Sequence, residues 1–182
     1  MKLDSENINA LLDACKRGKH TAQNTLYNHY ARQMFTVALR IVKQHALAED
    51  CMQDAFIKAF AQLGQFEYRS SFGAWLKRIV VNTAIDAIRK QKLEIEFDTD
   101  LHETESPTEI ETQDTTEEIC FNVERIKSAM LLLPDGYRIV LSLILFEGYD
   151  HDEVAAILAV SSSTSRSQYT RARHRLLEIL SK

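Results

Sequence analysis

Apolar residues recur along this chain at the spacing of amphipathic helices, and no segment shows the sustained alternation expected of a β-strand. In the first segment Ile8, Leu12 and Cys15 fall on one helix face, and Gly18 is placed to end that helix. Three further helices are predicted in the same way. The apolar face of the second helix consists of Leu26, Tyr30, Met34, Val37 and Ile41. That of the third consists of Met52, Ala55, Phe56, Ala59 and Phe60, and that of the fourth of Trp75, Ile79, Thr83 and Ile88. Four helices in about ninety residues make one compact bundle.

Helical spacing returns in the second half of the chain. The face of one predicted helix consists of Val123, Ile126, Met130 and Leu133. The turn-forming tripeptide Pro134-Asp135-Gly136 breaks this helix, and a second helix is predicted over residues 137–146, ending at Gly148. The whole chain is therefore predicted to be all-α.

The last forty residues show a more specific arrangement of caps and turns. Asp150 can cap a helix, and Glu153, three positions on, completes a capping box. Residues 159–161 then form a tight turn, and Ser161 or Ser162 can cap the next helix, which is rich in arginine. The apolar positions are Val154, Ile157 and Leu158 on the short helix and Tyr169, Ala172, Leu176 and Leu177 on the basic helix. This order predicts a helix-turn-helix.

Charge is distributed unevenly along the chain. Residues 93–118 contain eleven Asp or Glu and no Lys or Arg, and they lack any sustained hydrophobic period. Such a segment buries too little apolar surface to offset its ordering entropy, so a flexible acidic linker is predicted. Removing these eleven charges from the net charge of −4 leaves the rest of the chain at +7. Two basic helical bodies, residues 1–92 and 119–182, indicate a nucleic-acid partner.

Several classes of function find no support in the sequence. No stretch approaches the roughly 20 apolar residues of a membrane helix, and the N-terminus lacks the order of a signal peptide. Cys15, Cys51 and Cys120 are odd in number and far apart, and no histidine pair has ligand spacing. No nucleophile–base pair or phosphate-binding glycine loop is present. We expect a soluble cytoplasmic protein that is not an enzyme and uses no metal or cofactor.

Two segments resemble conserved regions of sigma-70-type RNA polymerase sigma factors. AEDCMQDAFIKAF (48–60) followed by SSFGAWLKRIVVNTAIDAIRK (70–90) is similar to their second region, and residues 133–176 are similar to the fourth, which reads the −35 element. Because little but the acidic segment separates them, the chain resembles the extracytoplasmic-function (ECF) subgroup. The segments LPDGYR, FEGY and TSRSQ are similar to ECF factors of Bacteroidetes-type bacteria.

The resemblance implies an alternative sigma factor that binds core RNA polymerase, recognises −35 and −10 promoter elements and starts transcription. It implies a four-helix region 2 domain over residues 1–92, a flexible acidic linker over 93–118 and a helix-turn-helix region 4 domain over 119–182. The implied partners are the clamp of the polymerase's largest subunit, the flap region, promoter DNA and an anti-sigma factor. We expect no direct membrane insertion.

The resemblance also assigns a polymerase-binding face. The segment that matches residues 48–60 docks against the clamp in relatives, and its polar stripe consists here of Glu49, Asp50, Gln53 and Asp54. The competing interpretation is a solvated helix face, which is what most polar stripes are.

The loop before the fourth helix resembles one that captures a base flipped out of the −10 duplex. The DNA-contact candidates are Tyr68, Arg69 and Ser70 in this loop and Lys77, Arg78, Asn82 and Arg89 on the following helix, with Lys90 beside them. An exposed aromatic ring can replace lost base stacking. Phe66 and Phe72 have a competing interpretation as core residues packed on Trp75. Asp86 is expected to pair within the helix, and Val81 stands where many relatives have a basic residue.

On the basic helix of the helix-turn-helix, side chains near the start are expected to reach −35 base edges. The candidates are Ser163, Thr164, Arg166, Ser167, Gln168, Arg171 and Arg173. Arg pairs well with guanine and Gln with adenine, so Arg166 and Gln168 are the predicted readers. Arg171 and Arg173 are predicted to meet phosphates. Ala159 stands where a glycine is frequent in this turn, which predicts some backbone strain.

Two alternatives remain open on these residues. The acidic linker either mimics RNA phosphates in the polymerase channel or is a solvated tether. A stand-alone DNA-binding regulator explains the helix-turn-helix, although it leaves residues 48–90 without a task.

Overall fold

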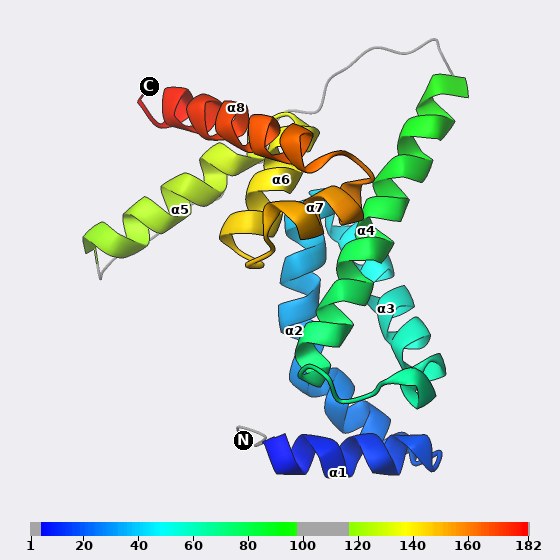
Figure 1. The fold of residues 1–182 in the computed structure, drawn as a ribbon. Coiled ribbons are helices and arrows are strands. Elements are labelled where there is room, and N and C mark those ends of the chain that lie inside the picture. Colours follow the sequence, from blue (N-terminus) through cyan, green and yellow to red (C-terminus); the bar gives the residue numbers. More distant parts are fainter. Residues whose placement is uncertain (1–4, 98–116, 182) are drawn as a thin grey trace. The chain divides into compact units, whose positions relative to one another are not determined.

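The computed structural model describes the backbone of residues 5–97 and 117–181, and these residues form α-helices and one short 3-10 helix, without a strand. The chain divides into two compact units, Met1–Arg89 and Lys90–Lys182 (Figure 1). The predicted all-α class, with one helical domain followed by a helix-turn-helix domain, is confirmed.

The first unit is built from long amphipathic helices. Its elements are α1 (Ser5–Lys16), α2 (His20–Val42), α3 (His45–Ala61), η1 (Leu63–Gln65) and α4 (Phe72–Phe97). The largest fully buried side chains are Leu12, Leu26, Met34, Val37, Ile41, Leu76, Val80 and Val81. Burying each one contributes about 1.5–3 kcal/mol, so apolar periodicity is the main cause of the fold. The predicted end of α1 at Gly18 is confirmed, because Gly18 has φ +78 and the next amide, of Lys19, donates to Ala14 O at 3.0 Å.

Helix α4 joins the bundle through specific contacts. The Tyr30 and Phe72 rings lie 5.5 Å apart, and Lys58 Nζ donates to Thr83 Oγ1 at 3.2 Å. A Cβ on Gly73 would lie 2.9 Å from the Tyr30 ring, so glycine permits this close approach. The predicted apolar face of α4 was partly wrong, because Trp75 and Ile79 are only half-buried. The buried face consists of Phe72, Leu76, Val80, Val81, Thr83, Ala84, Ile85 and Ile88.

The second unit consists of α5 (Glu117–Leu131), α6 (Asp135–Leu145), α7 (His151–Leu158) and α8 (Ser162–Leu180). Its core includes Ala129, Met130, Leu133, Leu141, Ala172 and Leu176. Helix α6 begins two residues before the prediction, because Pro134 serves as its N-cap and Asp135 lies in its first turn. The buried Arg138 donates from Nη1 to Asp135 Oδ1 at 2.6 Å. Burial lowers the pKa of Arg138, and Asp135 opposes this change.

The ends of the predicted linker are helical. Helix α4 continues to Phe97 and α5 begins at Glu117, while residues 98–116 lie outside the described residues. The predicted flexibility of this segment and the boundaries of the two domains therefore stay predictions. Within the described ranges no helix is long and apolar enough to cross a membrane.

Candidate polymerase and nucleic-acid interfaces

Helix α3 presents its polar stripe to solvent. Glu49, Asp50, Gln53 and Asp54 are all exposed. The opposite face buries Ala48, Cys51, Met52, Ala55 and Phe56. Burial, and secondarily the charges of Asp54 and Asp50, raise the pKa of Cys51 to about 11. The stripe is thus an acidic surface on a helix fixed from behind by the core.

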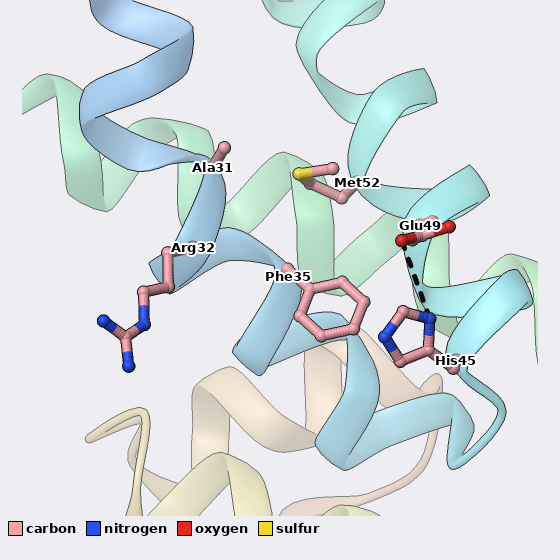
Figure 2. A pocket seen from close by; sticks show the side chains of 6 residues that line it. All are labelled: Ala31, Arg32, Phe35, His45, Glu49 and Met52. Carbon is pink, nitrogen blue, oxygen red and sulfur yellow. Dashed lines mark ion pairs between the residues drawn. The ribbon is translucent and has the colours of Figure 1, made fainter.

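A small hollow lies beside this stripe, between α2 and α3 (Figure 2). Its lining consists of Ala31, Arg32, Phe35, His45, Glu49 and Met52. The Phe35 and His45 rings lie 4.8 Å apart, and His45 Nδ1 lies 3.6 Å from Glu49 Oε1. Glu49 therefore belongs both to the acidic stripe and to a hollow with an aromatic wall. The hollow has no signature in the sequence, because it depends on the packing of two helices.

The loop between η1 and α4 divides into core residues and exposed residues. Phe66 and Phe72 are buried and lie 5.2 Å and 5.8 Å from the Trp75 ring, so their interpretation as core residues is confirmed. Tyr68, Arg69 and Ser70 are exposed. Arg69 Nε lies 2.7 Å from Glu67 Oε2, and because both side chains are exposed the pair is worth little. The loop thus offers Tyr68 as its accessible aromatic ring.

The DNA-contact candidates on helix α4 differ in solvent exposure. Arg78, Asn82 and Arg89 are exposed, whereas Lys77 is half-buried. The expected role of Asp86 is confirmed, since its Oδ1 accepts from Arg89 Nη1 at 3.5 Å within the helix. The neighbouring Lys90 is also exposed. A basic face with one amide therefore follows the exposed loop.

Val81 belongs to the core of the first unit. Its side chain is fully buried, whereas the nearby Arg78 and Asn82 are exposed. The position where many relatives have a basic residue therefore offers no side chain to DNA in this protein.

The helix-turn-helix is confirmed in detail. Asp150 Oδ1 accepts from the amides of Asp152 and Glu153 at 2.8 Å, and Glu153 Oε2 accepts from the Asp150 amide at 2.9 Å. This is the predicted capping box. At the other side of the turn Ser161, not Ser162, is the N-cap of α8, and its Oγ accepts from the Thr164 amide at 3.1 Å. An N-cap thus fixes the start of each of the two helices.

The turn itself contains the expected strain. Ala159 adopts the left-handed conformation, with φ 56 and ψ 46. This conformation costs a residue with a Cβ roughly 1–2 kcal/mol, which is why glycine suits this position.

The recognition helix α8 presents five of its seven candidates fully. Ser163, Arg166, Ser167, Arg171 and Arg173 are exposed, and Thr164 and Gln168 are half-buried. The hydroxyls of Ser163 and Thr164 each lie 2.8 Å from Ser161 Oγ, and Ser167 donates to Thr164 O at 3.0 Å. Arg166 is therefore the candidate with the freest polar group near the helix start.

One inward position on α8 was predicted wrongly, and one contact was missed. Leu177 is 54% exposed, because it lies about 100° around the helix from the buried Leu176. The fully buried Ser165 has its Oγ 3.1 Å from His151 Nδ1 and so ties α8 to α7. No sequence pattern signals this pair, because it arises from the angle between the two helices.

Comparison with protein families matches both units. The sigma-70 region 2 family matches residues 26–94, and the sigma-70 region 4 family matches residues 124–176. These domains define a sigma-70-type transcription factor. The RNA polymerase sigma-H factor of Pseudomonas aeruginosa is 29% identical over 94% of this chain and 92% of that protein. The ECF RNA polymerase sigma-E factor of Escherichia coli K12 is 30% identical over 90% of this chain and 88% of that protein.

Two solved sigma factor structures are similar to this chain in fold. The sigma factor RpoE of Bartonella quintana, crystallised with the anti-sigma factor NepR, has a TM-score of 0.63 and 28% identity, covering 87% of this chain and 96% of that chain. CnrH, solved with the cytosolic domain of CnrY, shares the fold with a TM-score of 0.55 at 23% identity, over 94% and 96% of the two chains. The chain belongs to the ECF sigma factors of the sigma-70 family. It is a non-enzymatic factor that directs transcription initiation with core RNA polymerase and promoter DNA.

Proposed function

We propose that the protein bridges core polymerase and two promoter elements through three separate surfaces. The acidic stripe of α3 binds the polymerase clamp, the loop before α4 together with α4 opens the −10 element, and α8 reads the −35 element. The observation that supports this division best is the exposure of Arg166 in the first turns of α8, the helix that Ser161 caps after the turn. That is the position from which a recognition helix reaches base edges.

The polymerase-binding proposal rests on charge and burial. Glu49, Asp50, Gln53 and Asp54 share an exposed face of a helix whose other face is core, so they can meet a basic partner without disturbing the fold. Complementary charge mainly increases the association rate and the specificity of such an interface. The hollow beside Glu49 lies next to this face (Figure 2).

The −10 proposal assigns different tasks to the loop and the helix. Tyr68, Arg69 and Ser70 meet the unpaired base, since stacking on an aromatic ring is worth about 1–3 kcal/mol and roughly matches the cost of unstacking. Lys77, Arg78 and Arg89 hold phosphates and Asn82 reads a base edge. Because the free energy gained by stacking nearly balances the cost of unstacking the base, this site suits promoter opening that uses no ATP.

The −35 proposal separates reading from positioning. Arg166 and Gln168 read bases, and Arg171 and Arg173 hold phosphates. Ser163, Thr164 and Ser167 assist from the first turns of α8, where their hydroxyls already form the local hydrogen bonds described above.

Several finer assignments belong to the same proposal. We place region 2 at residues 1–92, the flexible linker at 93–118 and region 4 at 119–182, and we place the protein in the cytoplasm. We propose an anti-sigma factor as its regulator, supported by the similarity to the Bartonella quintana sigma factor, which was crystallised with one. A Bacteroidetes-like subgroup is supported by the segments LPDGYR, FEGY and TSRSQ. The polymerase flap is the proposed partner of region 4.

Reconstituted transcription tests the proposal as a whole. The chain is added to purified core polymerase with a pool of genomic fragments, and transcript starts are mapped. We expect a set of starts that share −35 and −10 elements, with footprints over both and unpaired bases at −10. A footprint over a single short duplex site, with no promoter-specific transcript, would support the stand-alone DNA-binding regulator instead.

A further inference from the structure

Tyr68 adopts a backbone conformation that bulky residues avoid. Its φ is +59, in the left-handed region that favours glycine, and it lies in the loop that the proposed function assigns to the unpaired −10 base. A strained backbone of this kind persists only where surrounding contacts enforce it, and such positions cluster at functional sites. The contacts of the Tyr68 side chain therefore indicate what holds it.

The Tyr68 hydroxyl is held by two charged residues of α1. It donates to Asp13 Oδ1 at 3.0 Å and accepts from Lys16 Nζ at 3.3 Å. Lys16 Nζ also lies 4.5 Å from the centre of the Tyr68 ring, within cation–π range. Because one contact uses the donor and the other the acceptor of the hydroxyl, its position is fixed from two sides.

Helix α1 is a firm support for these two residues. Leu12 and Cys15 immediately precede Asp13 and Lys16, and both are buried. Asp13 and Lys16 lie three residues apart, so they share a helix face. The turn at Gly18 closes the helix behind them with paired backbone groups. Helix α1 also lies outside residues 26–94, which match region 2, so this support is a feature of the chain beyond the matched domain.

We propose that Asp13 and Lys16 are positioning residues that hold the Tyr68 ring ready to stack on the unpaired −10 base. The inference rests on the proposed −10 function of Tyr68. A loop tyrosine that is free to change rotamer loses conformational entropy when it captures a base, whereas a ring held in advance loses less. The buried Phe66 ring lies 4.8 Å from the Tyr68 ring, measured between ring centres, and supports it from the core. Tyr68 remains 43% exposed, which leaves ring surface for a ligand.

The test measures binding of the reconstituted holoenzyme to a fluorescent single-stranded oligonucleotide. The oligonucleotide contains the non-template −10 sequence of a promoter that the chain transcribes. Tyr68→Phe removes the hydroxyl but keeps the ring, and Asp13→Ala removes the acceptor. We expect Asp13→Ala to weaken binding about fivefold, as for loss of one net hydrogen bond of ~1 kcal/mol. Tyr68→Phe should weaken binding at least as much, because it also removes the contact with Lys16. The double variant should bind no more weakly than Tyr68→Phe alone, because the loss of the hydroxyl already breaks the link to Asp13.

Matched variants separate positioning from general effects. Asp13→Asn keeps an acceptor oxygen and should restore most of the binding. Lys16→Gln should weaken binding, whereas Lys19→Gln, in the same basic turn but without a contact to Tyr68 among the described interactions, should weaken it far less. Affinity for core polymerase and the thermal midpoint should stay the same in all variants. A merely structural role would lower the midpoint and would not depend on the Tyr68 hydroxyl.

The outcomes distinguish the positioning role of Asp13 and Lys16 from the proposed −10 role of Tyr68. If Tyr68→Ala weakens binding while Tyr68→Phe and Asp13→Ala do not, the positioning role is wrong and the −10 role of Tyr68 stands. If Tyr68→Ala has no effect, the −10 role fails, and the inference fails with it. Tighter binding by Asp13→Ala would mean that α1 restrains the ring, which also overturns the inference.

Discussion

Buried hydroxyl groups in this protein differ in whether a hydrogen-bond partner reaches them. Thr83 Oγ1 accepts from Lys58 Nζ, and Ser165 Oγ meets His151 Nδ1. The Ser142 hydroxyl is buried in α6 without a hydrogen-bond partner among the described residues. An unpaired buried hydroxyl costs about 1–3 kcal/mol. Individual positions such as Ser142 and the left-handed Ala159 therefore lower the stability of the second unit.

Replacing Ala159 with glycine should stabilise the second unit. The left-handed conformation costs alanine roughly 1–2 kcal/mol, and glycine loses roughly 0.5–1 kcal/mol in backbone entropy on folding. We expect Ala159→Gly to raise the free energy of unfolding by about 0.5 kcal/mol, measured by urea denaturation with circular dichroism. The matched control is Gly148→Ala, which places a Cβ at φ +76 and should lower stability. A loss of stability in Ala159→Gly would contradict the strain argument.

Cys51 should be unreactive in the folded protein. Its raised pKa, about 11 against an ordinary value of 9.0, leaves almost no thiolate at pH 8. Cys15 is also buried, and burial raises its pKa. We expect a thiol reagent to label neither residue at pH 8 until denaturant is added, as located by mass spectrometry of the labelled peptides. Rapid labelling of Cys51 without denaturant would contradict its burial.

The same shift gives stability a defined dependence on pH. The unfolded thiol ionises near pH 9 while the folded thiol stays protonated to about pH 11, so this contribution is full below pH 9 and is lost as the pH rises towards 11. A Cys51→Ala variant should lose less stability than the wild type over that range.

At the scale of elements, caps and a contact between α7 and α8 hold the helix-turn-helix as one rigid unit. The capping box fixes the start of α7, Ser161 caps α8, and the His151–Ser165 contact ties the two helices together. The His151 and Tyr169 rings meet edge to face at 5.5 Å. Side chains at the start of α8 are therefore presented in a fixed direction, which base-specific reading requires.

This rigidity predicts different effects for two arginines of α8. Arg166→Ala should cost about 1–3 kcal/mol at particular −35 positions. Arg173→Ala should weaken binding by a similar factor across all sequences and reduce its salt dependence. Holoenzyme binding to a set of single-base −35 variants measures both. A loss from Arg166→Ala that is uniform across the set would mean that Arg166 touches only the DNA backbone.

At the scale of the whole molecule, charge is arranged by segment. The eleven acids of residues 93–118 offset a charge of +6 on residues 1–92 and of only +1 on residues 119–182. The net value of −4 therefore conceals one basic domain, and in the second body the basic residues gather on α8. Within the first unit the acidic stripe of α3 and the basic residues of α4 lie on different helices. One small domain can thus offer surfaces of opposite sign to a polymerase and to DNA.

Reversing the acidic stripe should abolish polymerase binding without unfolding the protein. Asp50→Lys with Asp54→Lys changes two exposed positions one turn apart. We expect loss of core-polymerase capture in a pull-down, with an unchanged circular dichroism spectrum and thermal midpoint. Asn24→Lys with Asn28→Lys adds positive charge at the same spacing on exposed positions of α2 and serves as the control. Unchanged capture by the α3 variant would remove the stripe from the interface.

The sequence located the residue types of the site better than their surroundings. It predicted the exposure of Tyr68, Arg166 and the acidic stripe, because polar positions opposite an apolar face point to solvent. It misjudged Leu177, Trp75 and Ile79, since i to i+4 spacing shows which side of a helix is apolar but not where the buried stripe ends. The edge of the buried stripe depends on which neighbouring helix covers that side of the helix.

The amino-acid sequence alone determined the order of the helices, the cap at Asp150, a serine cap at Ser161 or Ser162, and the strained turn at Ala159. Each of these depends on interactions within a few residues along the chain. What happens across helices could be learned only from the folded chain. The contact of α1 with Tyr68, the hollow beside Glu49 and the His151–Ser165 tie join residues from different elements. Such contacts follow from the packing angles of whole helices, and no local pattern encodes them.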